Sequence, residues 1–189
     1  MNYFKKITGE RCYLSPIDSR DSLKFCEWFN DFGIAKTLSV ISGQVQEDMQ
    51  RRILKMLAER GVCIFAILLS DGNKLIGSSE LNISSNMNFT AEVGITIGDR
   101  EYLSKGYGTE AMMLTLDFAF SILNMRNVML EVLAYNKRAI RSYEKCGFKE
   151  IGRRREAKEI CGKRHDVVYM DILREEFKSP YFEGEFEKE

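Results

Sequence analysis

Residues 104–111 (Ser-Lys-Gly-Tyr-Gly-Thr-Glu-Ala) place two glycines at the expected start of a helix. A β-like run at residues 92–98 precedes them, and an apolar helical pattern follows to about Leu123. Glycine lets the backbone approach a ligand closely. The free N–H groups of a first helical turn, together with the helix dipole, favour an anion. The stretch therefore predicts a phosphate site, and we interpret it as the holder of a cofactor's pyrophosphate.

Asn136 and Tyr143 are a second pair of residue types that can do chemistry, and they stand on a helix predicted over residues 136–146. Their spacing is close to two helical turns, which take about 7.2 residues, so both side chains point at one cleft. A phenol with a pKa near ~10 stays protonated at neutral pH and can donate to a thiolate with a pKa near ~8.5. The asparagine also suits a helix N-cap, and that role is compatible with a ligand contact.

The elements that must position these residues alternate between strands and helices. Strands are predicted at residues 11–17, 62–69, 74–83, 90–98, 127–135, 148–160 and 163–173, and helices at residues 18–29, 46–60, 107–123 and 136–146. Turn residues at 71–73 and 161–162 indicate two hairpins. The pattern predicts a single α/β (α+β) domain with a mixed, mostly antiparallel sheet of about seven strands and about four helices. We assign residues 1–175 to the domain and 176–189 to an acidic tail, surface-laid or frayed.

Composition excludes several classes of function. The 189 residues include 28 basic and 28 acidic ones, so the zero net charge gives no general reason to expect nucleic-acid binding. No apolar run is long enough to span a bilayer, and no signal-peptide core is present, so no membrane partner is expected. The five cysteines indicate reduced thiols in a cytoplasmic protein. The single histidine, His165, makes a metal site improbable, and none is expected.

Three groups of residues, in this order and spacing, resemble the Gcn5-related N-acetyltransferase (GNAT) superfamily. They are residues 91–98 (Ala-Glu-Val-Gly-Ile-Thr-Ile-Gly), 105–111 (Lys-Gly-Tyr-Gly-Thr-Glu-Ala) and 130–148, which hold Asn136 and Tyr143. Residues 14–17 (Leu-Ser-Pro-Ile) and 27–31 (Glu-Trp-Phe-Asn-Asp) are similar to those of the enzymes that acetylate the N-terminal alanine or serine of ribosomal proteins. One departure is Leu103, because the superfamily often carries Gln or Arg there. The pyrophosphate would then depend on backbone amides and Lys105.

The resemblance implies an N-acetyltransferase that moves the acetyl group of acetyl-coenzyme A (acetyl-CoA) to a primary amine by direct attack. The acceptor would be a protein N-terminus, a polyamine or a small amine. Tyr143 would act as general acid. The implied cofactor-binding residues are Ile95, Thr96, Ile97, Ser104, Lys105, Gly106, Tyr107, Gly108, Thr109, Asn136 and Tyr143. The strand holding Ile95 would pair with the pantetheine arm, and Gly94 is interpreted as a bulge that opens the slot.

The base that takes the proton of the amine is less narrowly defined. Glu131 matches the carboxylate that serves as base in the ribosomal-protein acetyltransferases, whereas Glu80, Glu92 or a water chain without a single base are the alternatives. By the same resemblance, Trp28, Phe29 and Phe32 border the acceptor pocket, although a core role is equally open. A homodimer is common in relatives, but the sequence carries no interface signal.

A non-catalytic acyl-CoA-binding or sensing module on the same fold is the alternative from another class of function. It would share the phosphate-binding turn and need no proton donor. The presence of Tyr143 favours the enzyme.

Overall fold

The computed structural model of the chain describes residues 3–38, 44–59, 62–85 and 88–181. The strands are β1 (Ile7–Thr8), β2 (Cys12–Pro16), β3 (Cys63–Leu69), β4 (Leu75–Ser85), β5 (Thr90–Ile97), β6 (Asn127–Leu133), β7 (Lys149–Ile160) and β8 (Lys163–Leu173). The α-helices are α1 (Ser22–Asn30), α2 (Phe32–Ala35), α3 (Glu47–Glu59), α4 (Tyr107–Asp117) and α5 (Lys137–Lys145). Short helical turns occur at Ser19–Asp21, Arg100–Tyr102, Phe118–Ile122 and Arg174–Glu176.

The strands form one sheet in the order β1-β2-β3-β4-β5-β6-β8-β7. Neighbouring strands are antiparallel except for β5 and β6, which run parallel. These two strands pair over only three residues each, ending at Glu92 and Met129. Because β5 continues to Ile97 and β6 to Leu133, the two strands diverge in the middle of the sheet.

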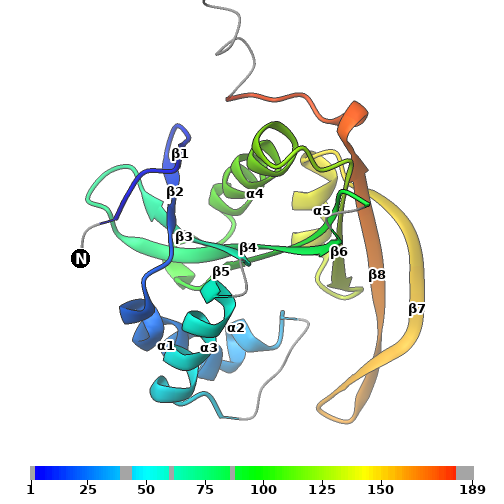
Figure 1. The fold of residues 1–189 in the computed structure, drawn as a ribbon. Helices are drawn as coiled ribbons and strands as arrows, with labels where there is room; N and C mark the ends of the chain where they lie inside the picture. The colour runs from blue at the N-terminus through cyan, green and yellow to red at the C-terminus, as the bar shows by residue number, and fades with distance from the viewer. Residues whose placement is uncertain (1–2, 39–43, 60–61, 86–87, 182–189) are drawn as a thin grey trace, which may run out of the picture.

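Helices cover both faces of this sheet. Figure 1 shows α1, α2 and α3 on one face and α4 and α5 on the other. Helix α4 is the most deeply buried, and Ala111, Met112, Leu114 and Leu116 expose no surface. A helix that is apolar on most sides belongs in a core. It packs against β2, β4 and β5, which holds its first turn beside the point where β5 and β6 part.

The predicted fold is confirmed, with small differences in its elements. The sheet has eight strands instead of about seven, since the two-residue strand β1 pairs with β2 and has no hydrophobic run to reveal it. The described part of the chain contains five α-helices instead of about four, because Asp31 accepts a hydrogen bond from the Gly33 N–H and starts the short helix α2. The helix predicted over residues 107–123 changes to a π-helical turn at Phe118. The end of the helix predicted over residues 46–60 lies outside the described residues, because residue 60 is not among them.

Gly94 does not form the predicted bulge. The pairing of β4 with β5 runs without a shift from Ala91 to Ile97 and places Gly94 opposite Glu80. A Cβ atom on Gly94 would lie 2.7 Å from Oε1 of Glu80, so the glycine makes room for this side chain. The opening in the sheet arises instead where the pairing of β5 with β6 ends.

The first part of the C-terminal tail lies against α4. The Phe177 ring packs on the Phe120 ring with centroids 5.1 Å apart. The buried Asp117 carboxylate accepts hydrogen bonds from the Ser179 hydroxyl (2.7 Å) and the Tyr181 N–H (3.0 Å). Residues up to Tyr181 are thus attached to the core. Residues 182–189 lie outside the described part, and the boundary assigned at residue 175 stays a prediction.

Candidate active site

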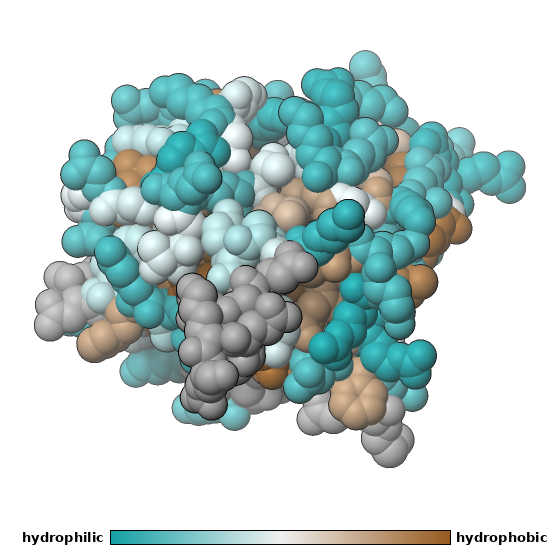
Figure 2. Space-filling model, turned by 90° about the horizontal axis from the view of Figure 1, so that it is seen from above, coloured by the Kyte–Doolittle hydropathy of each residue, from teal (hydrophilic) through white to brown (hydrophobic). Residues whose placement is uncertain are grey.

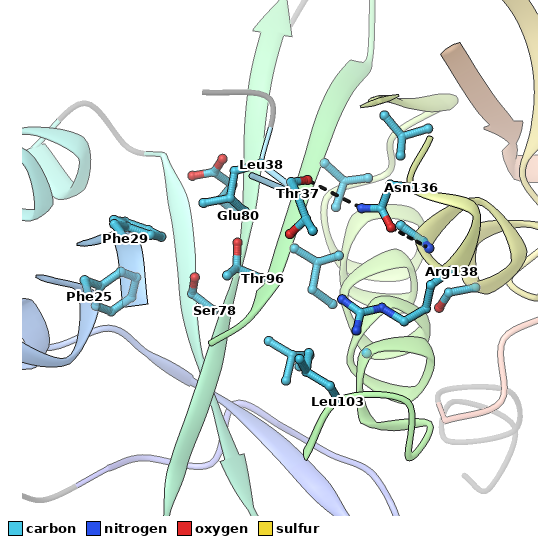
Figure 3. A pocket seen from close by; sticks show the side chains of 18 of the residues that line it. Phe25, Phe29, Thr37, Leu38, Ser78, Glu80, Thr96, Leu103, Asn136 and Arg138 are labelled. Carbon is cyan, nitrogen blue, oxygen red and sulfur yellow. Dashed lines mark hydrogen bonds between the residues drawn. The ribbon is translucent and has the colours of Figure 1, made fainter. Parts of the chain in front are cut away.

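A cavity of about 680 Å³ opens where β5 and β6 diverge. Its walls come from α1, α3, the strands β4, β5 and β6, the turn before α4, and α5. In Figure 3, Phe25 and Phe29 lie on one side and Asn136 and Arg138 on the other, with Glu80 on the sheet between them. The cavity therefore connects the two faces of the molecule through the gap in the sheet.

Most of the residues predicted to bind the cofactor line this cavity. They come from three segments and are Ile95, Thr96, Ile97, Ser104, Gly106, Gly108, Thr109, Asn136 and Tyr143. Lys105 and Tyr107 are not part of the lining. The Lys105 ammonium lies 5.8 Å from the centroid of the Tyr102 ring, and the Arg11 guanidinium lies over the Tyr107 ring. Only the backbone of these two residues takes part in the turn that faces the cavity.

The turn before α4 has the geometry of an anion site. Ser104 (φ 60°) and Gly106 (φ 89°) both adopt the left-handed conformation, and Gly106 caps the helix. The N–H groups of residues 106–109 donate to no acceptor in the described part of the chain. Adjacent free N–H groups at the positive end of a helix dipole attract phosphate. The local structure thus agrees with the sequence interpretation.

Strand β5 presents a free edge to the cavity beyond Glu92, because β6 no longer pairs with it there. An unpaired strand edge can bind an extended chain through its N–H and C=O groups. Residues 95–97 form this edge, and Ile95 and Ile97 also pack against the hydrophobic core. A narrow, flexible amide-containing chain such as pantetheine fits this arrangement.

Tyr143 is enclosed by protein and still reaches the cavity. Its ring packs edge-on against Phe148, with centroids 6.0 Å apart. Its hydroxyl has no hydrogen-bond partner among the described residues. Burial, with a smaller effect of Cys146, raises the pKa of Tyr143 to about 12. The phenol is therefore protonated throughout the neutral range and available as a donor.

Asn136 caps α5 as predicted, since its Oδ1 accepts a hydrogen bond from the Ala139 N–H (3.2 Å). Its Nδ2 donates to the Thr37 carbonyl (3.4 Å), which brings the segment after α2 to the cavity. A hydrogen bond of 2.7 Å between the Thr109 and Ser142 hydroxyls joins α4 to α5. These contacts fix the helix that carries Tyr143 relative to the phosphate-binding turn.

Glu80, Glu92 and Glu131 lie on three adjacent strands, and Glu80 and Glu131 line the cavity. None of the three carboxylates has a hydrogen bond or ion pair within the described residues. Burial and then the charge of Glu92 raise the pKa of Glu80, and burial and then the charge of Glu131 raise the pKa of Glu92. The three side chains thus form an unneutralised acidic region, although Glu80 keeps surface open to the cavity.

A positively charged wall of the same cavity was missed by the sequence analysis. Arg138, Arg141 and Lys145 line it from α5, and none of them forms an ion pair within the described residues. In Figure 3 the Arg138 side chain reaches into the cavity. Their spacing puts them on one side of the helix, so the periodicity that linked Asn136 to Tyr143 could also have revealed them.

The three aromatic residues expected at the acceptor pocket lie in three different places. Phe29 lines the cavity, together with Phe25. Trp28 is buried against the end of β5, where a Cβ atom on Gly98 would lie 1.9 Å from its Cδ2. Phe32 lines an adjoining hollow of about 410 Å³ that also includes His165.

Residues 11–149 match the acetyltransferase (GNAT) domain family. The chain belongs to this family. The membership confirms the resemblance that rests on the turn before α4, the strand before it and the helix of Tyr143. This acetyltransferase uses acetyl-CoA as donor and an amine as acceptor, and the free N–H groups, the open β5 edge and the cations of α5 suit a donor with phosphates and an amide chain.

Two relatives and one solved structure extend the comparison. The spermidine N(1)-acetyltransferase of Vibrio cholerae serotype O1 is 35% identical over 111 residues, 58% of this chain and 64% of that enzyme. YdaF of Bacillus subtilis (strain 168), named as a candidate ribosomal N-acetyltransferase, is 32% identical over 115 residues, 61% of this chain and 62% of YdaF. Each match thus spans under two thirds of the relative. The structure of the Vibrio cholerae spermidine N-acetyltransferase with CoA and spermine has a TM-score of 0.80 and 25% identity, covering 89% of this chain and 98% of that one.

The described residues contain no group of three His, Cys, Asp or Glu side chains placed to hold a metal ion. None of their helices combines the length and apolar character needed to cross a membrane. The face seen in Figure 2 is mostly hydrophilic, with hydrophobic residues in small areas between polar ones.

Proposed function

We propose that this acetyltransferase acetylates a primary amine on an acceptor that carries more than one positive charge, with Tyr143 as general acid. One observation carries the proposal. A single cavity has unpaired carboxylates at one end, free N–H groups and cations at the other, and a half-buried phenol in its wall. This arrangement suits a cationic acceptor and an anionic donor that meet in the middle.

At the donor end, the N–H groups of residues 106–109 would hold the pyrophosphate, and the edge of β5 would pair with the pantetheine arm. Arg138, Arg141 and Lys145 would face the remaining phosphate charge. Charge-assisted hydrogen bonds of this kind are the strong ones. The absence of a basic side chain at Leu103 is thus offset by cations that α5 supplies.

In the reaction, the amine nitrogen forms a bond to the acetyl carbon, and the bond from that carbon to sulfur breaks. Tyr143 gives its hydroxyl proton to the departing sulfur and later regains one from solvent. A phenol with an ordinary pKa near ~10 stays protonated at neutral pH, so it can donate its proton to a departing thiolate whose ordinary pKa is near ~8.5.

The surplus proton of the amine goes to a carboxylate. We assign Glu131 as the base, because it lines the cavity on the strand that borders the opening. Glu80 is the alternative, since its raised pKa brings it closer to the pH at which a base is most effective. Glu92 does not line the cavity. It would affect the reaction only through its charge, which acts on the neighbouring carboxylates.

At the acceptor end, the unneutralised Glu80, Glu92 and Glu131 favour a chain with several ammonium groups. Like charges that lie close together repel one another, and an acceptor cation would compensate them. The Vibrio cholerae structure with spermine supports a polyamine, whereas YdaF supports a ribosomal protein N-terminus. The acidic lining favours the polyamine.

Release of free CoA thiol measured with a panel of acceptors tests the proposal. The panel contains spermidine, a peptide with an N-terminal alanine or serine, and a monoamine of similar length. We expect kcat/KM for spermidine to exceed that for the monoamine by about tenfold or more, equivalent to about 1.4 kcal/mol. Equal values, or a preference for the peptide, would contradict the assigned acceptor class. Tight acetyl-CoA binding without thiol release from any acceptor would favour the sensing module.

A further inference from the structure

Arg11 contacts the phosphate-binding turn from behind. It lies between β1 and β2, and its Nη1 donates a hydrogen bond of 2.9 Å to the carbonyl of Lys105. Its guanidinium also lies over the Tyr107 ring, 4.9 Å from the ring centroid. Arg11 is not part of the cavity lining. Its contacts are therefore made on the side of the turn that faces away from the ligand.

Glu110 fixes the position of this guanidinium. Its buried carboxylate accepts hydrogen bonds from Nε of Arg11 (2.9 Å), from the Arg11 N–H (2.7 Å) and from the Cys12 N–H (3.2 Å). The approach is close, because a Cβ atom on Gly9 would lie 2.6 Å from Oε1 of Glu110. Backbone and side chain of Arg11 are thus held by one carboxylate, and the rigid fork of the guanidinium points at the turn.

The bond to Lys105 determines where the next N–H group points. In a planar trans peptide, the C=O of one residue and the N–H of the next point in opposite directions. Since the Lys105 carbonyl points at Arg11, the Gly106 N–H points away from Arg11, and Gly106 lines the cavity whereas Arg11 does not. A rotated peptide would instead turn the carbonyl oxygen toward a bound anion and repel it.

We propose that Arg11 is a positioning residue for the diphosphate of acetyl-CoA, and that it acts by anchoring the Lys105 carbonyl so that the Gly106 N–H faces the cavity. The inference rests on the proposed placement of the pyrophosphate at this turn. Ser104 has a φ of 60°, which residues other than glycine adopt rarely, so the turn is held in a sparsely populated conformation that such an anchor stabilises. Arg11 therefore acts on the ligand through the backbone.

Calorimetric titration of Arg11→Met with CoA and with pantetheine, which lacks the phosphates, tests the inference. We expect CoA to bind about tenfold more weakly, equivalent to about 1.4 kcal/mol, while pantetheine binding changes less than about twofold. Arg20→Met is the matched control, because Arg20 is an exposed arginine paired only with Asp18; it should leave both affinities unchanged. Arg11→Lys keeps the charge but cannot span Glu110 and the Lys105 carbonyl, so it should still bind CoA at least about fivefold more weakly.

Three results would overturn the inference. Equal weakening of CoA and pantetheine would show that Arg11 only supports the fold of the cleft. Unchanged CoA binding would show that the turn needs no anchor, and full recovery in Arg11→Lys would show that charge alone matters. If Arg11→Met does not fold, Glu110→Gln provides the second variant, with an expected loss of about threefold for CoA alone. The titrations need no turnover, so their outcome is independent of the acceptor panel.

Discussion

Helix α5 lines one end of the cavity with Arg138, Arg141 and Lys145, whereas β4 and β6 line the other end with Glu80 and Glu131. The cations stand on a helix whose residues are all at least partly exposed. The carboxylates stand on strands inside the sheet, where burial raises the pKa of Glu80. The two ends therefore differ in the sign of their charge. They also differ in how that charge affects the stability of the protein without ligand.

This difference follows from the elements that carry the charges. Long cationic side chains on a helix surface keep their charged ends in water until a ligand arrives. A glutamate on a central strand has a short side chain and no such freedom, so it remains among other carboxylates. We infer that the cations at the donor end carry little electrostatic cost in the free protein. The acceptor end holds a repulsion that only a cation relieves.

Tyr143 lies between the two ends, and its replacement should have the largest effect. In Tyr143→Phe, kcat should fall about 100- to 1,000-fold, in the range of general acid catalysis, because the departing sulfur has no proton donor. The dissociation constant for acetyl-CoA should stay within about twofold, since the ring and its packing on Phe148 remain. Steady-state thiol release and acetyl-CoA titration measure the two quantities.

Glu131→Gln is the comparison for Tyr143→Phe, because it removes the proposed base and keeps the shape of the side chain. It should lower kcat and leave the dissociation constant for acetyl-CoA nearly unchanged, because the proposed base acts on the amine and not on the donor. Unchanged turnover in Tyr143→Phe would exclude the phenol as the acid. Unchanged kcat in Glu131→Gln would transfer the role of base to Glu80 or to water.

Substitutions in the turn before α4 change only the donor end. Their effect should be smaller than that of Tyr143→Phe. Gly106→Val should weaken acetyl-CoA binding at least about tenfold, or 1.4 kcal/mol, because φ is 89° and a Cβ atom would lie 3.0 Å from the Arg11 guanidinium. Lys105→Ala should weaken it less than about threefold, since this side chain does not line the cavity. Affinities from calorimetry compare the two.

Gly108→Ala serves as the control for this pair, because its Cβ atom would meet only Ile97, at an ordinary 3.5 Å. It should bind acetyl-CoA more tightly than Gly106→Val. If Lys105→Ala is the most damaging of the three changes, the side-chain charge at the turn outweighs the backbone amides.

The sequence predicted the turn before α4 and helix α5 better than the acidic strands of the sheet, for physical reasons. The turn at Gly106 and the spacing of Asn136 and Tyr143 are local features, and a helix that begins after a glycine turn is recognisable from a few residues. The same periodicity would have identified Arg138 and Arg141. The membership in the GNAT family confirmed the fold that these motifs indicated.

Features that depend on distant segments could not be predicted. The opening of the sheet exists because β5 and β6 stop pairing after Glu92, and the length of a pairing is decided by packing across the whole sheet. Gly94 was therefore misread as a bulge, although it makes room for Glu80 on the neighbouring strand. The contact of Arg11 with Glu110 joins residues 99 positions apart, and nothing in either local sequence signals it.

At the acceptor end, Glu80→Gln should have the smallest effect on turnover. It should also stabilise the folded protein at neutral pH. The KM for a polyamine should rise about three- to tenfold, which is about the net contribution of one typical hydrogen bond, with kcat nearly unchanged. The pKa of Glu80 is raised in the folded protein, so its protonated form is favoured there. Its contribution to stability is present at low pH and is lost as pH rises through that raised pKa.

Glu80→Gln should therefore raise the melting temperature above that of the wild type at pH 7 to 8, and the gain should shrink toward pH 4, where the wild-type carboxyl is protonated. Thermal unfolding at several pH values measures this, with the exposed Glu101→Gln as the matched control. Addition of spermidine should stabilise the wild type more than the variant, since only the wild type holds the full set of carboxylates. A variant that is less stable than the wild type at neutral pH would mean that Glu80 is already neutralised in the free protein. The repulsion that distinguishes the acceptor end from the donor end would then not exist.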